Sequence, residues 1–134
     1  MEFTEAVKSV FSKYATFQGR ACRSEYWWFG LFCMIVAVGL LIVSNVALNG
    51  NGILNLLFTL AIFLPSLAVL VRRLHDIDKS GWWYFILIIP VIGFILFLIW
   101  MCKKGTAGPN RFGDDPLLRE IVLGPVAEIP AATP

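Results

Sequence analysis

Three long runs of apolar residues divide the chain, at residues 26–45, 53–71 and 82–101. Each run holds about twenty residues without an Asp, Glu, Lys, Arg or His, and a helix rising about 1.5 Å per residue crosses the hydrocarbon of a bilayer at that length. The pattern therefore predicts an all-α membrane protein with three transmembrane helices, forming a single integral membrane domain over residues 1–134.

The segment before the first run has apolar residues at intervals of three and four, with charged and hydroxyl residues between them. These apolar residues are Phe3, Val7, Val10, Phe11, Tyr14 and Phe17. The spacing predicts an amphipathic interfacial helix within residues 1–18. Such a helix either lies in the headgroup region or packs on the spans as a lid, and the pattern alone leaves both arrangements open.

Turn-forming residues mark the connections between the runs. Asn49-Gly50-Asn51-Gly52 predicts a very short connection between antiparallel first and second spans. Ser24 is expected to cap the first span, with Glu25 in its first turn. Pro65 predicts a kink in the second span, where a neighbouring hydroxyl or helix satisfies the freed carbonyl.

The third run and the residues after it contain further breaking residues. Pro90 and Gly93 lie near the middle of the run, so an alternative to a third crossing is a bent or re-entrant segment. Residues 102–134 are rich in Gly and Pro at first and end in Ile129-Pro130-Ala131-Ala132-Thr133-Pro134. They are expected to form a turn-rich C-terminal loop and a frayed tail.

Composition excludes several classes of protein. With 58% hydrophobic residues in 134 positions, a soluble domain would lack the polar residues needed to cover three apolar helices. The net charge of +2 comes without a dense basic stripe, so we expect no nucleic-acid partner. Cys22, Cys33 and Cys102 are widely spaced and His75 is the only histidine, so we expect no disulfide framework, no metal site and no cofactor.

The distribution of Lys and Arg predicts how the protein faces. There are four before the first run, none in the first loop, three in the second loop and four after the third run. Three crossings with a cytoplasmic N-terminus place seven inside and four outside. A re-entrant third segment would place all eleven on the cytoplasmic face. The first 25 residues lack the apolar core of a secretory signal, so the first span is expected to stay in the membrane.

Three ordered motifs carry a resemblance to a known family. They are Gly19-Arg20-x-x-Arg23-x-Glu25-Tyr26-Trp27, then Arg72-Arg73-Leu74-His75-Asp76 with Ser80-Gly81-Trp82-Trp83, then Gly105 to Pro116. The chain, from about Phe17 to Pro116, resembles the small bacterial inner-membrane proteins classed as domain of unknown function 805 (DUF 805). The resemblance implies a multi-pass protein of the bacterial cytoplasmic (inner) membrane and no settled activity. Asp78 stands where glycine is common in the family, and Asp114 at a variable position, so neither receives a role from it.

The His75-Asp76 pair invites comparison with metal-dependent phosphohydrolases, but those sites need further histidines and carboxylates that this chain lacks. We therefore expect no enzymatic activity. A histidine beside a carboxylate near the membrane can relay protons, because its unperturbed pKa lies near 6.5. In the structural interpretation, Asp76 instead pairs with Arg72, Arg73 or Lys79 and orders the loop.

The other polar residues of these motifs also have two interpretations. In the structural one, Arg20 and Arg23 reach lipid phosphates and Glu25 sits in a helix's first turn. In the functional one, the polar residues form one cluster that binds an anionic lipid headgroup or a partner's tail. That cluster comprises Arg20, Arg23, Glu25, Arg72, Arg73, His75, Asp76, Asn110 and Asp115. For Asn110, Asp114 and Asp115, a turn held by side-chain hydrogen bonds is favoured over a calcium loop.

Two hypotheses for function follow from these residues. The first is an accessory or interaction protein whose partners are membrane lipids, a partner membrane protein or further copies in a homo-oligomer. The second is a small oligomeric transporter or channel component, in which Asn55, Thr59, Ser66 and the His75-Asp76 loop line a path. Because three spans rarely enclose a path alone, the second hypothesis requires an oligomer.

Overall fold

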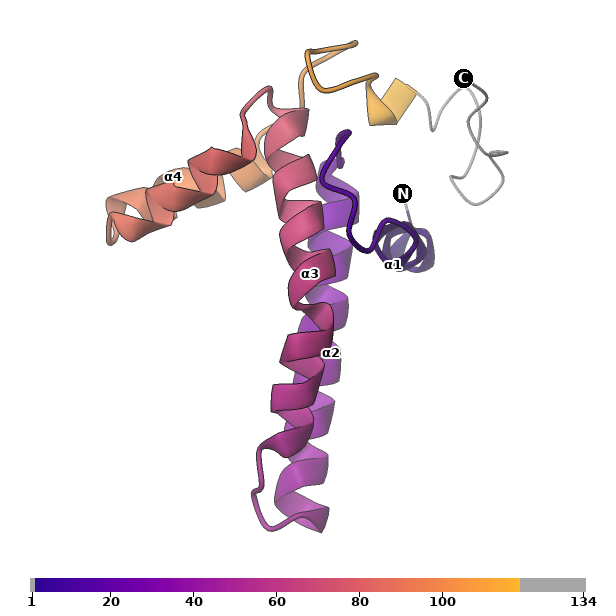
Figure 1. Cartoon of the computed structure of the whole chain (residues 1–134), viewed down its shortest axis with the longest axis vertical. Coiled ribbons are helices and arrows are strands. Elements are labelled where there is room, and N and C mark those ends of the chain that lie inside the picture. Colours follow the sequence, from indigo (N-terminus) through magenta and orange to yellow (C-terminus); the bar gives the residue numbers. More distant parts are fainter. Residues whose placement is uncertain (1, 119–134) are drawn as a thin grey trace.

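A computed structural model describes residues 2–118 of the chain as helices joined by turns. The elements are α1 (Phe3–Ser12), α2 (Arg23–Ala47), α3 (Ile53–Asp76), the 3-10 helix η1 (Gly81–Ile88) and α4 (Ile92–Cys102). In this part of the chain the only β-type pairing is an isolated bridge between Asn110 and Gly113. The helices α2 and α3 form a long hairpin, and α1 and the η1–α4 pair project from opposite sides of one end (Figure 1).

The helices α2 and α3 are the two helices of the described residues that qualify as membrane spans by length and composition. They contain 25 and 24 residues and are long and apolar enough to cross a bilayer. At 1.5 Å per residue each is about 36 Å long, more than the roughly 30 Å of hydrocarbon. Their apolar side chains face outward, as Val46 (81% exposed) and Phe63 (64%) illustrate. The predicted first and second spans are thus confirmed as two apolar helices of membrane-spanning length.

Both spanning helices extend beyond the apolar runs at the same end of the hairpin. The helix α2 begins at Arg23 with Cys22 at the N-cap, so the expected cap at Ser24 is wrong by two residues. The helix α3 continues to Asp76, so residues 72–76, the first part of the predicted second loop, belong to the end of this helix. The continuation is stabilised because Leu74 packs in a buried cluster with Ile77 and residues of α4.

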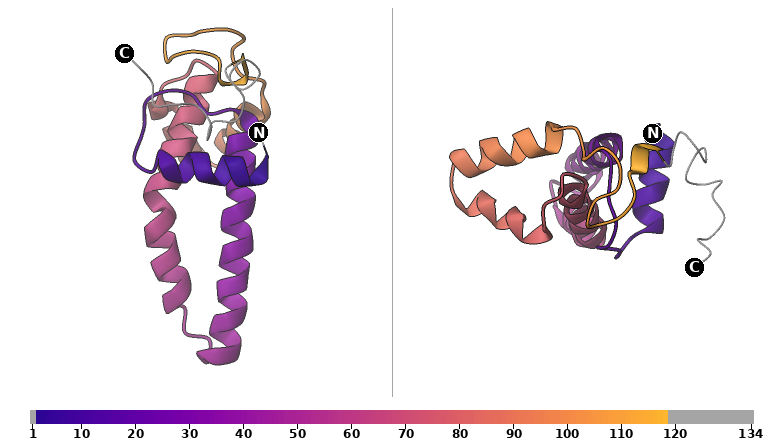
Figure 2. Two further views of the ribbon diagram at one scale, coloured as in Figure 1. Left: turned by 90° about the vertical axis from the view of Figure 1, so that its right-hand side faces the viewer. Right: turned by 90° about the horizontal axis from the view of Figure 1, so that it is seen from above.

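The predicted third spanning helix is not formed. The run divides into η1 and α4, which double back on each other as a hairpin that projects from one side of the spans (Figure 2). The chain reverses where Val91 adopts φ 63° and ψ −67° and the Ile92 N–H donates to the Pro90 carbonyl over 2.7 Å, a γ-turn. Proline favours a break here because it has no N–H to continue a helical ladder. The bent alternative is therefore the correct one.

A glycine lets the two arms of this hairpin approach each other. A Cβ on Gly93 would lie 1.9 Å from the carbonyl oxygen of Ile86. No side chain fits in that space, so the backbones of η1 and α4 meet directly. Gly93, predicted as a breaking residue, lies inside α4 and instead allows this close packing.

The helix α1 packs on the spans as a lid, one of the two predicted arrangements. Its Phe3 ring meets Trp28 edge to face at 5.8 Å between centroids, and its Phe11 ring meets Phe29 at 5.7 Å. Val10 is completely buried in a cluster with Phe29 and Val69. These contacts place α1 across both spans, on the side opposite the η1–α4 hairpin (Figure 2).

A hydroxyl group satisfies the carbonyl that Pro65 frees inside α3. Proline lacks the N–H that would otherwise bond to the carbonyl four residues earlier, which belongs to Ala61. The Tyr14 hydroxyl, just after α1, donates a hydrogen bond to that Ala61 carbonyl. The prediction of a neighbouring hydroxyl is thus confirmed, and the bond also ties the α1 segment to the middle of α3.

We expect Tyr14→Phe to lower the free energy of unfolding by about 1–2 kcal/mol, because it leaves the Ala61 carbonyl without a donor. In a Pro65→Ala background the residue at position 65 supplies that donor, so the same change should cost less than half as much. Denaturant titration in mixed micelles measures both costs, with Tyr84→Phe as the control. An equal cost in both backgrounds would contradict the assignment.

Candidate functional site at the basic end of the hairpin

The Asp76 carboxylate binds two arginines at the end of α3. Arg20 Nε donates to Oδ1 over 3.0 Å, and Arg73 Nη1 donates to Oδ2 over 2.7 Å. The aspartate side chain is 5% exposed, and the two arginine side chains are 1% and 0% exposed. Removing one partner from such a buried pair leaves an uncompensated charge, so the three groups stabilise the structure as a unit. We call these three residues the Asp76 triad.

Through Arg73 the triad caps the C-terminus of α4, whose last carbonyls have no intrahelical donors. Arg73 Nη2 donates to the Trp100 and Met101 carbonyls, each over 3.3 Å, and also to Lys103. A cation is further favoured here by the negative end of the helix dipole. Arg73 therefore fixes the base of the η1–α4 hairpin to α3.

Two residues of α2 complete this cap. Trp27 Nε1 donates to the Met101 carbonyl over 3.2 Å, and Arg23 Nη1 donates to the Cys102 carbonyl over 3.2 Å. The end of α4 thus receives donors from both spans. Nothing in the spacing of Trp27 along the sequence indicates this role.

Through Arg20 the triad holds the loop after α4. Arg20 Nη1 donates to the Gly108 carbonyl over 2.7 Å, and Nη2 donates to the Thr106 carbonyl. Gly105 lies so close to the Asp76 carboxylate that a Cβ at this position would be 2.1 Å from Oδ2. The expectation that Arg20 reaches lipid phosphates is therefore wrong, because its guanidinium is buried against Asp76 and backbone carbonyls.

A second buried pair joins α1, α2 and α3. Arg72 Nη1 donates to Glu25 Oε1 over 2.9 Å, and the Ser9 hydroxyl donates to the same oxygen over 2.9 Å. The pair is enclosed, with side-chain exposures of 1% for Arg72 and 2% for Glu25. Glu25 lies in the first turn of α2 as predicted, but its carboxylate faces inward. Ser9 was not predicted, since a serine on the polar side of a short helix is usually solvated.

His75 lies against the C-terminal loop. Its ring is parallel to the Phe112 ring, 3.9 Å away between centroids, and its Nδ1 lies 2.9 Å from the Gly19 carbonyl oxygen. Asn110 Nδ2 donates to the His75 backbone carbonyl over 2.9 Å. His75 and Asp76 thus bind different partners, and Asp76 is paired with Arg73 as the structural interpretation predicts.

Side-chain hydrogen bonds shape the loop as predicted for its Asn and Asp residues. Asn110 Oδ1 accepts the Phe112 N–H over 2.8 Å. Asp115 accepts the Leu117 N–H over 2.9 Å and the Gly108 N–H over 3.0 Å. Asp78 has φ 60°, a conformation that favours glycine.

All nine residues of the predicted polar cluster therefore lie at one end of the α2–α3 hairpin, which we call the basic end. Seven are buried or hydrogen-bonded inside this end through the contacts above, and Asp115 shapes the loop that Arg20 holds. Arg23 differs from the other three arginines because it remains exposed. The cations available at the surface are thus a different set from the buried arginines.

Two apolar helices of spanning length with a buried ionic end define the class as helical membrane proteins. A family model described as "Protein of unknown function (DUF805)" matches residues 14–114, and the chain belongs to this family. The resemblance found in its motifs is confirmed.

Relatives of known localisation support the same class. The chain is 43% identical to inner membrane protein YhaI of Escherichia coli K12 over 108 residues, covering 81% of this chain and 92% of the relative. It is 42% identical to inner membrane protein YhaH of the same organism over 113 residues, covering 81% and 93%. No solved structure matches the chain.

We expect Asp76→Asn to lower the free energy of unfolding by about 3–5 kcal/mol, because Arg20 and Arg73 would share a neutral partner. Gly105→Ala should also destabilise, since its methyl group would overlap the same carboxylate. Thermal unfolding in micelles measures both, with Gly52→Ala as the control, where a Cβ meets nothing within 4 Å. Wild-type stability in Asp76→Asn would refute the structural role of the triad.

Proposed function

We propose that this chain is a non-enzymatic accessory protein of the inner membrane that binds anionic lipid headgroups with exposed cations at its basic end. The observation that carries the proposal is the position of Arg23. It lines a surface hollow of about 370 Å³ together with Ser24, Trp27 and Cys102. An exposed guanidinium, a hydroxyl and an interfacial tryptophan are groups that a lipid phosphate and glycerol region can contact.

Neighbouring charges support an anionic ligand at this hollow. Lys103 and Lys104 are exposed and directly follow Cys102, whose carbonyl binds Arg23. The hollow also opens at the N-terminus of α2, where the helix dipole favours an anion. Each cation close to a membrane surface contributes about 1 kcal/mol to binding anionic lipid. We call Arg23, Lys103 and Lys104 the basic rim.

Two other cations at this end, Lys79 and Arg111, have local partners and add less. Lys79 Nζ lies 4.7 Å from the Trp100 ring centroid, and Arg111 Nε lies 3.3 Å from Asp78 Oδ1. The basic rim is thus favoured over these positions.

The transporter hypothesis has weaker support. Asn55, one of its path-lining candidates, donates to the Ala37 carbonyl across the two spans over 3.0 Å. Ser66 lines a mainly apolar groove between α2 and α3. The Asp76 carboxylate, needed for a proton relay, is occupied by two arginines. Polar groups engaged in this way hold helices together, which is the commoner role of such residues in membrane bundles.

We further propose that the basic end faces the cytoplasm. Every Lys and Arg within residues 2–118 lies in or beside the elements at this end, and residues 48–52 at the other end carry none. Positive residues flanking spans are retained on the cytoplasmic side. Two crossings place the N-terminal helix and the C-terminal loop on the same side, in contrast to the three-crossing arrangement.

A membrane-impermeant maleimide tests this orientation through Cys102, which is exposed at the basic end. We expect no labelling of Cys102 in intact cells and full labelling after permeabilisation. An Asn51→Cys variant in a Cys102→Ser background reports the opposite end and should react in intact cells. Labelling of Cys102 in intact cells would place the basic end outside.

Replacing Arg23 tests headgroup binding. Since one interfacial cation contributes about 1 kcal/mol, Arg23→Gln should reduce the preference for phosphatidylglycerol over phosphatidylcholine about fivefold. Spin-labelled lipids of both types, added to protein reconstituted in nanodiscs, measure that preference. Arg111→Gln is the matched control, because it removes an exposed arginine of the loop after α4 that is not part of the basic rim. An unchanged preference in Arg23→Gln would refute the proposed site.

A further inference from the structure

The η1–α4 hairpin is apolar on every side. No Asp, Glu, Lys, Arg or His occurs from Gly81 to Cys102. Its most exposed side chains come from η1, the tip and α4, with exposed fractions of 77% for Trp82, 76% for Ile88, 70% for Val91 and 64% for Ile92. A helix lying among headgroups keeps one polar face, whereas a helix that is apolar all round requires apolar surroundings.

The backbone at the tip of the hairpin is suited to hydrocarbon. Its N–H groups donate to carbonyls within the hairpin: Ile89 to Ile86 over 3.0 Å, Ile92 to Pro90 over 2.7 Å, and Gly93 to Ile89 over 3.2 Å. At the base, the last carbonyls of α4 receive donors from Arg73, Trp27 and Arg23. Polar backbone groups must be satisfied internally wherever lipid surrounds the chain.

Lipid chains fit this surface better than a second copy of the protein. A partner helix would cover one side of the hairpin and leave the other exposed, whereas acyl chains surround it completely. The base of the hairpin also carries two tryptophans, Trp83 and Trp100, whose rings meet edge to face at 5.7 Å between centroids. Tryptophans of this kind mark the boundary between headgroups and hydrocarbon.

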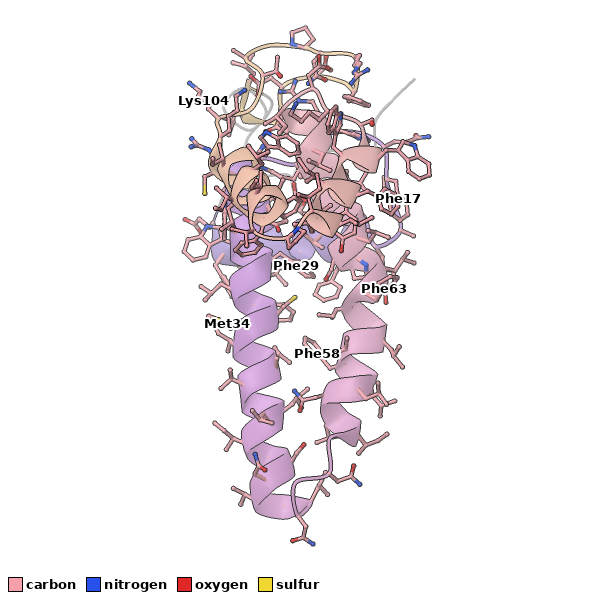
Figure 3. The ribbon with its side chains drawn as sticks, turned by 90° about the vertical axis from the view of Figure 1, so that its left-hand side faces the viewer. Phe17, Phe29, Met34, Phe58, Phe63 and Lys104 are labelled. Atoms are coloured by element: carbon pink, nitrogen blue, oxygen red, sulfur yellow. The ribbon has the colours of Figure 1, made fainter. Side chains whose placement is uncertain are left out.

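The arrangement makes the protein wide at one end and narrow at the other. The hairpin projects from one side of the basic end and α1 from the opposite side, while only α2, α3 and their turn reach the other end (Figure 1, Figure 2). Viewed from the hairpin side, Lys104 lies at the wide end, and the narrow part below consists of the two spans with Phe58 between them (Figure 3).

The difference in width can be expressed as an area. With helices about 10 Å across, arms about 16 Å long occupy roughly 320 Å² in the plane of the membrane, and α1 adds roughly 150 Å². One leaflet therefore accommodates about 470 Å² of protein that the other leaflet does not. A molecule of this shape fits best where the leaflet at its wide end is the convex one.

We propose that the chain is selective for membrane curvature, with the η1–α4 hairpin embedded among acyl chains of one leaflet as a wedge. The proposal rests on the shape and apolarity of the molecule and is independent of the basic rim. A convex leaflet offers more area per lipid at its surface, so insertion of the wide end relieves its packing stress. The partner is thus a curved bilayer surface, recognised without a specific headgroup.

Orientation in vesicles of two sizes tests the proposal. The native protein is reconstituted in small sonicated and in large extruded vesicles of pure phosphatidylcholine, which removes any contribution from anionic headgroups. External labelling of Cys102 with an impermeant maleimide gives the outward-facing fraction, and Cys102→Ser gives the background. We expect the odds of the wide end facing outward to be at least about twofold higher in small vesicles, equivalent to about 0.4 kcal/mol. Equal odds in both vesicle sizes would overturn the proposal.

Matched lysine substitutions locate the effect within the molecule. Ile88→Lys places a charge at the hairpin tip, which is drawn toward the headgroups, so the difference between vesicle sizes should be lost. Val46→Lys places the same charge at a similarly exposed position of the narrow end and should preserve the difference. A difference that survives Ile88→Lys would show that the hairpin is not the wedge.

Accessibility of the tip to lipid provides an independent measurement. In a chain whose native cysteines are replaced by serine, a fluorophore on Ile88→Cys should be quenched by brominated acyl chains. Efficient disulfide formation between copies at high lipid dilution would instead show that a second copy covers the hairpin, and would overturn the assignment of lipid as the partner. If the wedge proposal fails while these variants keep the preference for phosphatidylglycerol over phosphatidylcholine, the failure concerns the hairpin and not the basic rim.

Discussion

The whole basic end depends on one carboxylate that compensates two buried guanidiniums. A neutral residue cannot replace Asp76, because Arg20 and Arg73 both need a negative partner once water is excluded. Arg73 uses its remaining donors on the last carbonyls of α4, and Arg20 uses its remaining donors on carbonyls of the loop after α4. In this way a single charge cluster positions the η1–α4 hairpin, the loop after it and the segment before α2.

Burial divides the arginines of this chain into two groups with different consequences. Arg20, Arg72 and Arg73 lie inside and are bound to carboxylates, so they hold the helices together. Arg23 lies only a few residues from Arg20 but remains at the surface, where its charge is available to a ligand. The difference arises because α2 begins at Arg23, which turns its side chain outward, while Arg20 lies in the extended segment that crosses the end of α3.

Local patterns predicted those features that depend on local physics. The turn at residues 48–52, the satisfied carbonyl before Pro65 and the hydrogen-bonded Asn110 and Asp115 turns each involve the requirements of a few neighbouring backbone groups. The pairing of Asp76 with Arg73 was also predictable, since the two residues are one helical turn apart. Arg20 as a second partner was not, because it lies 56 positions away and looks like any interfacial arginine.

By itself, the sequence determined that this is a helical membrane protein of the DUF805 family whose first two apolar runs form helices joined by a short turn, because runs of about twenty apolar residues match the hydrocarbon thickness of a bilayer. It predicted a third spanning helix as well, which the structure does not form. Only the tertiary structure decided the fate of the third run. A run of that length and composition satisfies the hydrocarbon equally well as one crossing helix or as a hairpin in one leaflet. The choice depends on the Gly93 contact, on the turn at Val91 and on Arg73, which caps α4 beside the end of α3. The Gly93 contact and the turn at Val91 are local to the run, whereas Arg73 lies 28 positions from Met101. This long-range contact, which nothing in the run itself indicates, fixes where the hairpin lies.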